Sequence, residues 1–151
     1  MYSLNKQAKQ VSCAFFGHRN CPETIAGELE AQIERLILQY HVQCFYVGHE
    51  GMFDSLVLQA LIKLEKKYPS IDYAVVQAYL NSDVGSAICS HRLFPEVLNN
   101  VHPRFAIDRR NRWMIDMSDI VVVFVNHDWG GAAKFAKIAL QKGRLVINLA
   151  K

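Results

Sequence analysis

The 151-residue chain is long enough to fold as one domain, residues 1–151, and to bury about two thirds of the surface that its unfolded state exposes. Its 51% hydrophobic and 21% charged residues exclude the disordered and fibrous classes of protein. A net charge of only +3, spread along the chain, argues against a nucleic-acid partner, because surfaces that coat DNA concentrate Lys and Arg, and it leaves a small anionic ligand as the expectation.

The cysteines and the N-terminal residues indicate a compartment. The four cysteines lack CxxC spacing and we interpret them as reduced; they are Cys13, Cys21, Cys44 and Cys89. Residues 1–10 are polar and contain no apolar stretch of roughly 7 to 15 residues typical of a signal peptide. No run approaches the roughly 18 apolar residues of a membrane span. We therefore expect a cytoplasmic protein with no membrane partner.

Strand and helix patterns alternate along the chain. Short apolar runs, many of them ending at glycine, alternate with stretches in which apolar residues recur at helical spacing. In chain order the patterns predict strand 11–16, helix 22–40, strand 43–47, a helix with an apolar stripe over 56–64 that ends before Pro69, strand 71–78, helix 108–119, strand 119–125, helix 132–142 and strand 145–149. Gly143 suits the left-handed position after a helix.

These elements predict the fold. Strands that are apolar on both faces and separated by amphipathic helices indicate a parallel sheet with helices on both sides. We expect an α/β, doubly wound, Rossmann-like domain of about five strands in the order 3-2-1-4-5, which makes the first and fourth strands neighbours. Residues 79–101 do not fit this scheme, and we expect either a flap over the site or a short helix around 94–99.

Three glycine-bearing turns fall at the carboxyl ends of the expected strands. They are Gly17-His18-Arg19-Asn20, Gly48-His49-Glu50-Gly51 and residues 126–131. Ligands of open parallel sheets bind at this edge, where the winding reverses. Glycine lets backbone amides approach a ligand, and each turn leads into a helix whose N-terminus favours an anion. A single such turn is as easily explained by chain reversal, but the three together predict a phosphate-bearing ligand.

The histidines of these turns raise the question of a metal. His18, His49 and His127 each follow a strand, which makes a three-histidine site conceivable. Neither HxH nor HExxH spacing accompanies them, and histidines in loops are usually solvated or hydrogen-bonded. We therefore expect no metal and no cofactor.

Charged side chains near the turns have two interpretations each. Arg109, Arg110 and Arg112 form either a solvated helix face or a group for bidentate anion recognition. The spacing of Arg112 and Asp116 predicts an i,i+4 ion pair. Asp54 is expected either to cap the second helix or to accept a ligand hydroxyl.

The stretch RNRWMIDMSD, followed by an apolar strand and GGA, resembles the Arg-x-x-x-Met-x-x-x-Ser-Asp, strand, Gly-Gly core of the SLOG superfamily. That group includes the Lonely Guy phosphoribohydrolases, the DNA-processing A proteins and many bacterial SLOG proteins. The similarity extends to FFGHRN and YVGHEGMFD and covers most of the chain except residues 79–101. It implies a Rossmann-like nucleotide site in which Arg110 contacts the ligand, Met114, Ser118 and Asp119 complete the pattern, and Gly130 and Gly131 form the phosphate loop.

The last motif departs from the hydrolases of that group. They carry Pro-Gly-Gly-x-Gly-Thr-x-Glu-Glu, where this chain reads WGGAAKFAK from Trp129 to Lys137. Ala136 and Lys137 therefore replace the two glutamates, although hydrolysis needs a carboxylate near the ribose C1′. Glu50 and Asp54 are the candidates to replace them. Lys134 or Lys137 could instead meet a phosphate directly.

Three functional hypotheses follow. The first is a domain that binds or senses a nucleotide or a related phosphorylated ligand. The second is an enzyme that cleaves the N-glycosidic bond of nucleoside monophosphates, with Glu50 or Asp54 as catalytic residue. The third is a subunit with a vestigial site whose interface is formed by Trp113, Trp129 or residues 79–101. SLOG relatives are often dimeric, so the resemblance also implies a homo-oligomer. The expected ligand-binding residues are Gly17, His18, Arg19, Gly48, Glu50, Gly51, Arg110, Asn111, Met114, Gly130, Gly131 and Lys134.

Overall fold

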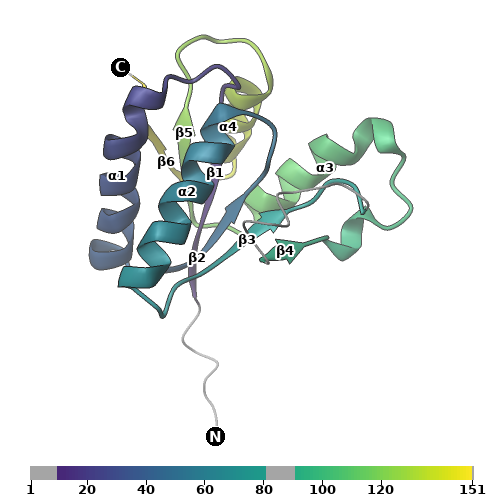
Figure 1. The fold of residues 1–151 in the computed structure, drawn as a ribbon. Helices are drawn as coiled ribbons and strands as arrows, with labels where there is room; N and C mark the ends of the chain where they lie inside the picture. The colour runs from purple at the N-terminus through teal and green to yellow at the C-terminus, as the bar shows by residue number, and fades with distance from the viewer. Residues whose placement is uncertain (1–9, 81–90, 151) are drawn as a thin grey trace, which may run out of the picture.

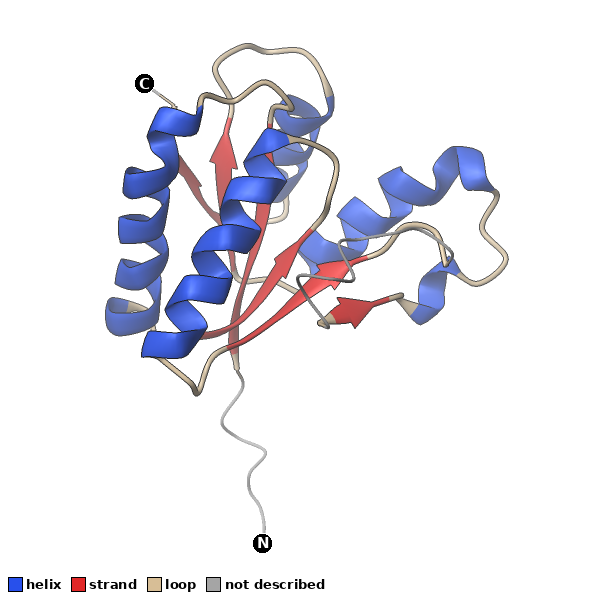
Figure 2. Ribbon diagram, viewed as in Figure 1, coloured by secondary structure: helices blue, strands red, loops and turns tan. Residues whose placement is uncertain are grey.

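The computed structural model describes residues 10–80 and 91–150. Its centre is a parallel six-stranded sheet in the order β4-β3-β2-β1-β5-β6, and helices pack on both faces (Figure 1). The strands are β1 (Val11–Gly17), β2 (Val42–Val47), β3 (Asp72–Val76), β4 (Arg92–Leu93), β5 (Ile120–Phe124) and β6 (Leu145–Asn148). The helices are α1 (Ala26–Gln39), α2 (Met52–Lys67), α3 (Pro103–Asp116) and α4 (Gly131–Gln141), with 3-10 turns η2 (Glu23–Ile25) and η3 (Glu96–Leu98). Figure 2 shows how the helices and strands alternate along the chain.

The predicted Rossmann-like class is confirmed, with a correction to the strand count and order. The five predicted strands keep their predicted relative order, and β4 adds a sixth strand outside β3. The N–H groups of Val75 and Gln77 donate to the carbonyls of His91 and Leu93, both at 2.7 Å. A two-residue strand has no periodicity to detect, because alternation needs about four residues to be visible.

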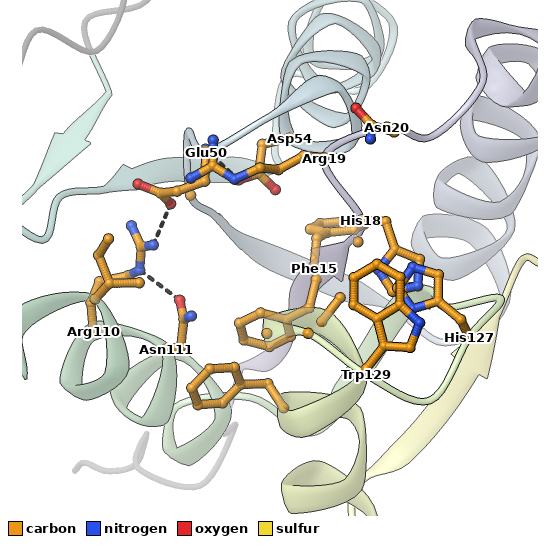
Figure 3. Close-up of a pocket in the computed structure, with 18 residues that line it drawn as sticks. Phe15, His18, Arg19, Asn20, Glu50, Asp54, Arg110, Asn111, His127 and Trp129 are labelled. Carbon is orange, nitrogen blue, oxygen red and sulfur yellow. Dashed lines mark hydrogen bonds and ion pairs between the residues drawn. The ribbon is translucent and has the colours of Figure 1, made fainter.

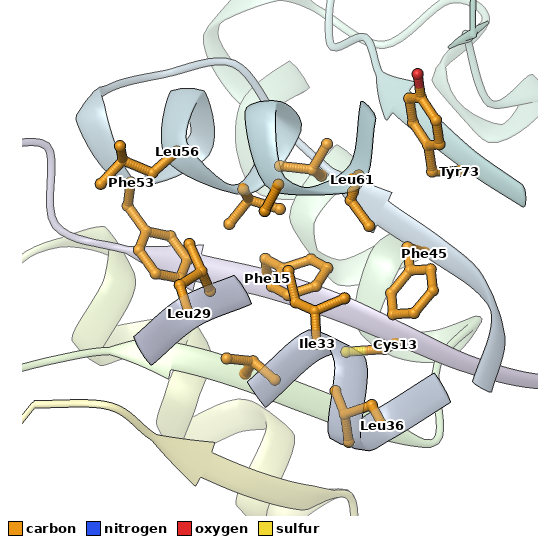
Figure 4. Close-up of a cluster of buried hydrophobic side chains, with 14 of the residues drawn as sticks. Cys13, Phe15, Leu29, Ile33, Leu36, Phe45, Phe53, Leu56, Leu61 and Tyr73 are labelled. Carbon is orange, nitrogen blue, oxygen red and sulfur yellow. The ribbon is translucent and has the colours of Figure 1, made fainter. Parts of the chain in front are cut away.

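Alternate residues of the central strands enter two cores. In β1, Cys13 and Phe15 pack under α1 and α2, whereas Ala14 and Phe16 pack under α3 and α4. Figure 4 shows the first core, in which the rings of Phe15 and Phe45 stack with centroids 6.0 Å apart. Side chains of successive strand residues point to opposite faces, so a strand covered on both sides must be apolar throughout.

The largest boundary error concerns α3, which begins at Pro103 rather than at residue 108 and ends at Asp116 rather than at 119. His102 caps it, since its Nδ1 accepts from the N–H of Arg104 at 3.0 Å, and Pro103 occupies the first helical position. The short helix expected around 94–99 is present as η3. The alternative prediction for residues 79–101 is a flap over the site. Residues 81–90 of that segment lie outside the described residues. Gly143 has the predicted left-handed conformation, with φ of 79°.

The predicted ion pair between Arg112 and Asp116 is wrong. Arg112 Nε donates to Asp108, one turn earlier, at 2.7 Å, and Asp116 at the end of α3 pairs with Lys142, which directly follows α4. Spacing allowed either partner for Arg112, and the packing of α4 beside α3 decided between them.

The last residues of the Arg-Met-Ser-Asp pattern join α3 to the sheet. Ser118 Oγ donates to the carbonyl of Met114 at 2.7 Å, and Asp119 accepts from the N–H of Ser12 at 3.0 Å. The N–H of Asp119 donates in turn to the carbonyl of Ser12 at 2.9 Å. These two residues therefore fix where β5 starts relative to β1.

The structure describes three of the four cysteines. Cys13, Cys21 and Cys44 are free, as expected for reduced cysteines, and Cys89 lies outside the described residues. Burial raises the pKa of the Cys13 thiol well above its usual value. Among the described residues no helix has the length and apolar character that crossing a membrane requires.

Gly17, the last residue of β1, is expected to tolerate no side chain. A Cβ there would lie 2.7 Å from Phe53 Cβ and closer still to its ring carbons, and Phe53 is fully buried. We expect Gly17→Ala to lower the free energy of unfolding by about 1–3 kcal/mol, because the overpacked ring must move. Denaturant unfolding of the wild type and the variant measures this change in the free energy of unfolding.

Gly27 supplies the matched control, since a Cβ at this position would meet no described atom within 4 Å beyond the nearby backbone of α1 itself. Gly27→Ala should leave the stability unchanged or raise it by up to about 1 kcal/mol. Equal effects of the two substitutions would show that the contact with Phe53 does not constrain Gly17.

Candidate functional site

A cavity of about 430 Å³ lies beyond the carboxyl ends of the central strands (Figure 3). The turns after β1, β2 and β5 line it together with α3 and the start of α4, and its volume is typical of small-molecule sites. The structure brings together most of the residues predicted to bind ligand, namely Gly17, His18, Arg19, Gly48, Glu50, Arg110, Asn111, Gly130 and Gly131, and with them the candidate Asp54.

Three of the predicted residues lie elsewhere. Gly51 lets two turns touch, because a Cβ there would lie 2.7 Å from Arg19 Cα, and the N–H of Met52 donates to the carbonyl of Arg19. Met114 is fully buried in the core under α3 and α4. Lys134 pairs with Asp108 at 2.7 Å and does not line the cavity.

The apolar part of the wall was not predicted as part of a site. Phe15, Phe16, Ile107 and Phe135 line the cavity, although none of them is among the residues that the sequence predicted to bind ligand. Phe16 and Phe135 stack with centroids 5.7 Å apart. Strand residues nearest to a ligand-binding edge belong to the core and to the site together, and periodicity alone does not separate the two roles.

Arg110 is the most constrained charged residue, with only 2% of its surface exposed. Its Nη1 donates to the carbonyl of Val76 at 2.8 Å, its Nε to Asn111 Oδ1 at 2.7 Å, and its Nη2 to Glu50. Burial raises the pKa of Glu50, but the charge and hydrogen bond of Arg110 outweigh that effect and hold the pKa below its usual value. The Glu50 carboxylate therefore neutralises this arginine at the cavity wall.

Asp54 lies beside Arg110 and Glu50, but its pKa is shifted in the opposite direction to that of Glu50. Burial raises its pKa to about 6, although the N–H of Glu50 donates to its Oδ2 at 2.9 Å. The N-cap of α2 is Gly51, without a side-chain cap, so Asp54 stabilises the preceding turn rather than capping the helix. A Cβ at Gly48 would lie 3.0 to 3.2 Å from Glu50, Asp54 and Arg110, so only glycine leaves this group undisturbed.

The start of α4 supplies a different kind of surface. Gly130 has φ of 93°, a backbone conformation that favours glycine, and a Cβ on Gly131 would meet no described atom within 4 Å. The first turn of α4 contains no acidic residue. The leading N–H groups of a helix lack intrahelical acceptors and carry partial positive charge, and Gly130, Gly131 and Ala132 line the cavity. This wall suits an anion.

Arg19 is the remaining cation of the cavity. Its side chain is exposed, lines the cavity and forms no ion pair with any described residue. Arg109, by contrast, is exposed on α3 and does not line the cavity. The group of three arginines therefore divides, with Arg110 buried, Arg112 paired and Arg109 in solvent.

Two of the three turn histidines meet. The rings of His18 and His127 stack 3.6 Å apart, and Trp129 stacks on His127 at 3.8 Å. Burial lowers the pKa of His18, and the proximity of His127 lowers it further. His49 lies on the turn after β2 and is not part of this stack. Residues 10–80 and 91–150 contain no group of three or more histidines, cysteines or carboxylates arranged to hold a metal ion.

The chain resembles solved structures in fold rather than in sequence. No model of a known protein family matches it, and neither does any curated protein. DNA processing protein A from Streptococcus pneumoniae superimposes with a TM-score of 0.67 and 17% identity over 92% of this chain and 50% of that one. DNA processing protein A from Helicobacter pylori, described for its single-stranded DNA binding mode, superimposes with 0.67 and 14% identity over 93% and 66%. This chain thus spans half to two thirds of those proteins.

These likenesses support the Rossmann-like fold and correct one expectation. The DNA-processing A proteins belong to the group that the motifs resemble, although membership of the SLOG superfamily itself is not shown by any sequence match. The expectation that nucleic acid is no partner is overturned by the fold neighbour described as binding single-stranded DNA. Net charge alone is a weak argument against such a partner, because proteins that bind single strands combine phosphate contacts with stacking of bases on aromatic rings.

Replacing Asp54 tests the protonation of the cavity wall. Its folded-state pKa of about 6 exceeds the ordinary 3.8, so the carboxylate costs stability above pH 6, and this cost declines as the pH falls toward 4. Asp54→Asn keeps an oxygen acceptor for the Glu50 N–H. We expect this variant to be about 1–3 kcal/mol more stable than the wild type at pH 8.

In urea unfolding, the advantage of Asp54→Asn should be constant from pH 8 to about pH 7 and should shrink as the pH falls from there to 4.5, through the folded-state pKa of about 6. The prediction is wrong if the stability difference between the two proteins is the same at pH 8 and pH 4.5, or if the variant is less stable at pH 8. Either result would mean that ionisation of Asp54 does not destabilise the folded protein.

Proposed function

We propose that this domain binds a nucleotide in the cavity at the carboxyl edge of the sheet. The observation that carries the proposal is the start of α4: two glycines and a first turn without carboxylates line a nucleotide-sized cavity. Phosphate binds readily at such helix N-termini because unpaired N–H groups and the helix dipole favour it. The phosphate is therefore assigned to Gly130 and Gly131.

The rest of the cavity suits the sugar and the base. Aromatic rings line one part, and the polar group of Arg110, Asn111 and Glu50 lies apart from Trp129 (Figure 3). Asn111 Oδ1 accepts from Arg110, so the amide NH₂ is the donor group of this side chain. Small-molecule sites commonly combine an apolar wall with a few fixed polar groups.

Arg19 is assigned as the charged partner of the phosphate. Arg110 is neutralised by Glu50 and Lys134 by Asp108, whereas Arg19 has no ion-pair partner among the described residues. This assignment moves the anion-binding role away from Arg110, whose contacts with Val76 and Glu50 make it a structural residue of the wall.

Cleavage of the N-glycosidic bond is the alternative activity of the same cavity. A carboxyl group with a pKa of about 6, as in Asp54, can exchange a proton near neutral pH. Chromatography of nucleoside monophosphates incubated with the protein would reveal this activity as free base.

Calorimetry with nucleoside monophosphates tests the proposal. We expect AMP to bind more tightly than inorganic phosphate, and Arg19→Ala to weaken AMP binding by about 5- to 30-fold, since a charge-assisted hydrogen bond contributes about 1.5–3 kcal/mol before solvent access reduces it. Arg109→Ala is the matched control, because this arginine is exposed outside the cavity, and should leave the affinity unchanged. The proposal fails if no nucleoside monophosphate binds at millimolar concentration, or if both variants lose affinity equally.

Single-stranded nucleic acid is a second candidate ligand. It is favoured by the DNA-binding fold neighbour and by the exposed ring of Trp129 beside the cavity. Bases of a single strand are free to stack on aromatic rings, unlike those of a duplex. On this hypothesis the cavity holds one nucleotide unit of the strand.

Fluorescence anisotropy with a labelled 15-nucleotide strand tests the second candidate. We expect binding that AMP displaces, with a log-log salt slope of only about −0.7 to −1.4, because one or two phosphates of a single strand are neutralised. The duplex of the same sequence should bind more weakly. Absence of binding, or binding that saturating AMP leaves intact, rules out a strand held in this cavity.

A further inference from the structure

Trp129 forms the outer end of a three-ring stack at the cavity. His18 comes from the turn after β1, and His127 and Trp129 come from the turn after β5. The ring planes are inclined by 14° and 18°, so the stack is continuous (Figure 3). Trp129 nevertheless remains 69% exposed, although burying a tryptophan ring is normally favourable.

The inner end of the stack is anchored to the sheet. The N–H of His18 donates to the carbonyl of Phe124 at 3.2 Å, and His18 Nε2 accepts from the N–H of Asn126 at 3.2 Å. Phe124 also meets the His18 ring edge-on, at 6.5 Å between centroids. The two histidines therefore hold one face of the indole in place while the ring stays largely in solvent.

The position of the indole relates it to the proposed phosphate position. Trp129 immediately precedes Gly130 and Gly131 at the start of α4, and all three line the cavity. A phosphate at the glycines and a planar group on the indole would therefore lie at neighbouring residues of the same turn, within one cavity. The stack thus offers a preformed ring beside an anion-binding turn.

We propose that Trp129 is a stacking platform for the nucleobase of the bound nucleotide, held in place by His127 and His18. The inference rests on the proposed nucleotide site and adds the position of the base. It implies a preference for purines, whose larger ring systems cover more of the indole. It also assigns a function to the tryptophan that replaces the proline of the related motif.

Calorimetry separates the base from the phosphate. AMP should bind Trp129→Ala at least about fivefold more weakly than the wild type, the lower end of what one base–aromatic stack contributes. Ribose 5-phosphate, which has no base, should bind both proteins equally. Trp129→Phe keeps a ring and should retain most of the affinity, and the preference for AMP over UMP should decline in Trp129→Ala.

Phe105→Ala is the matched control, because Phe105 is an exposed aromatic residue of α3, 54% exposed, that does not line the cavity. It should bind AMP like the wild type. A second readout needs no change at Trp129: in Trp113→Phe, which leaves Trp129 as the sole tryptophan, AMP should quench the fluorescence and ribose 5-phosphate should not.

The outcomes distinguish the two proposals. Equal losses of AMP and ribose 5-phosphate binding in Trp129→Ala, or undiminished AMP binding together with unquenched fluorescence, overturn the stacking platform and leave the nucleotide site standing. A wild-type protein that binds neither compound overturns the nucleotide site, and the platform falls with it.

Discussion

The buried guanidinium of Arg110 is the interaction on which the cavity depends. It connects α3 to the carboxyl end of β3 through Val76 and to the turn after β2 through Glu50. Removing one partner of a buried ion pair leaves the other charge unpaired, at a typical cost of about 3–5 kcal/mol. The contacts of Arg110 that position α3 beside the sheet therefore also neutralise its positive charge, which the Arg-Met-Ser-Asp pattern had assigned to ligand binding.

Glycines make this arrangement possible by allowing the turns to approach. Gly17 accommodates the ring of Phe53, Gly51 accommodates Arg19, and Gly48 leaves room for the charged group around Arg110. At Gly130, by contrast, the backbone conformation itself favours glycine, with φ of 93°. Three of the four are thus required by neighbouring side chains, and the turn before α4 is the one shaped by its own backbone.

The walls of the cavity differ in charge, and this difference gives the site its proposed polarity. The carboxylates of Glu50 and Asp54 disfavour an anion at the turn after β2, whereas the start of α4 favours one. Arg19 packs against the turn after β2, and its positive charge partly offsets the negative charge of Asp54. The aromatic stack of His18, His127 and Trp129 forms the rim on the side of α4. A ligand with an anionic group beside a planar group matches this distribution.

The sequence by itself determined the class of the fold and the edge of the sheet at which the cavity lies. Apolar runs such as 11–16 and 120–124 can be buried only in a sheet covered on both faces, and strand order then places the turns after β1 and β5 together. The tertiary structure alone decided which charges are available. Arg110, Arg112 and Lys134 have ionic partners that spacing did not single out, whereas Arg19 forms no ion pair within residues 10–80 and 91–150. The tertiary structure also formed the stack of His18, His127 and Trp129. His18 and His127 lie on turns more than a hundred residues apart, and a contact over such a separation produces no periodic pattern in the sequence.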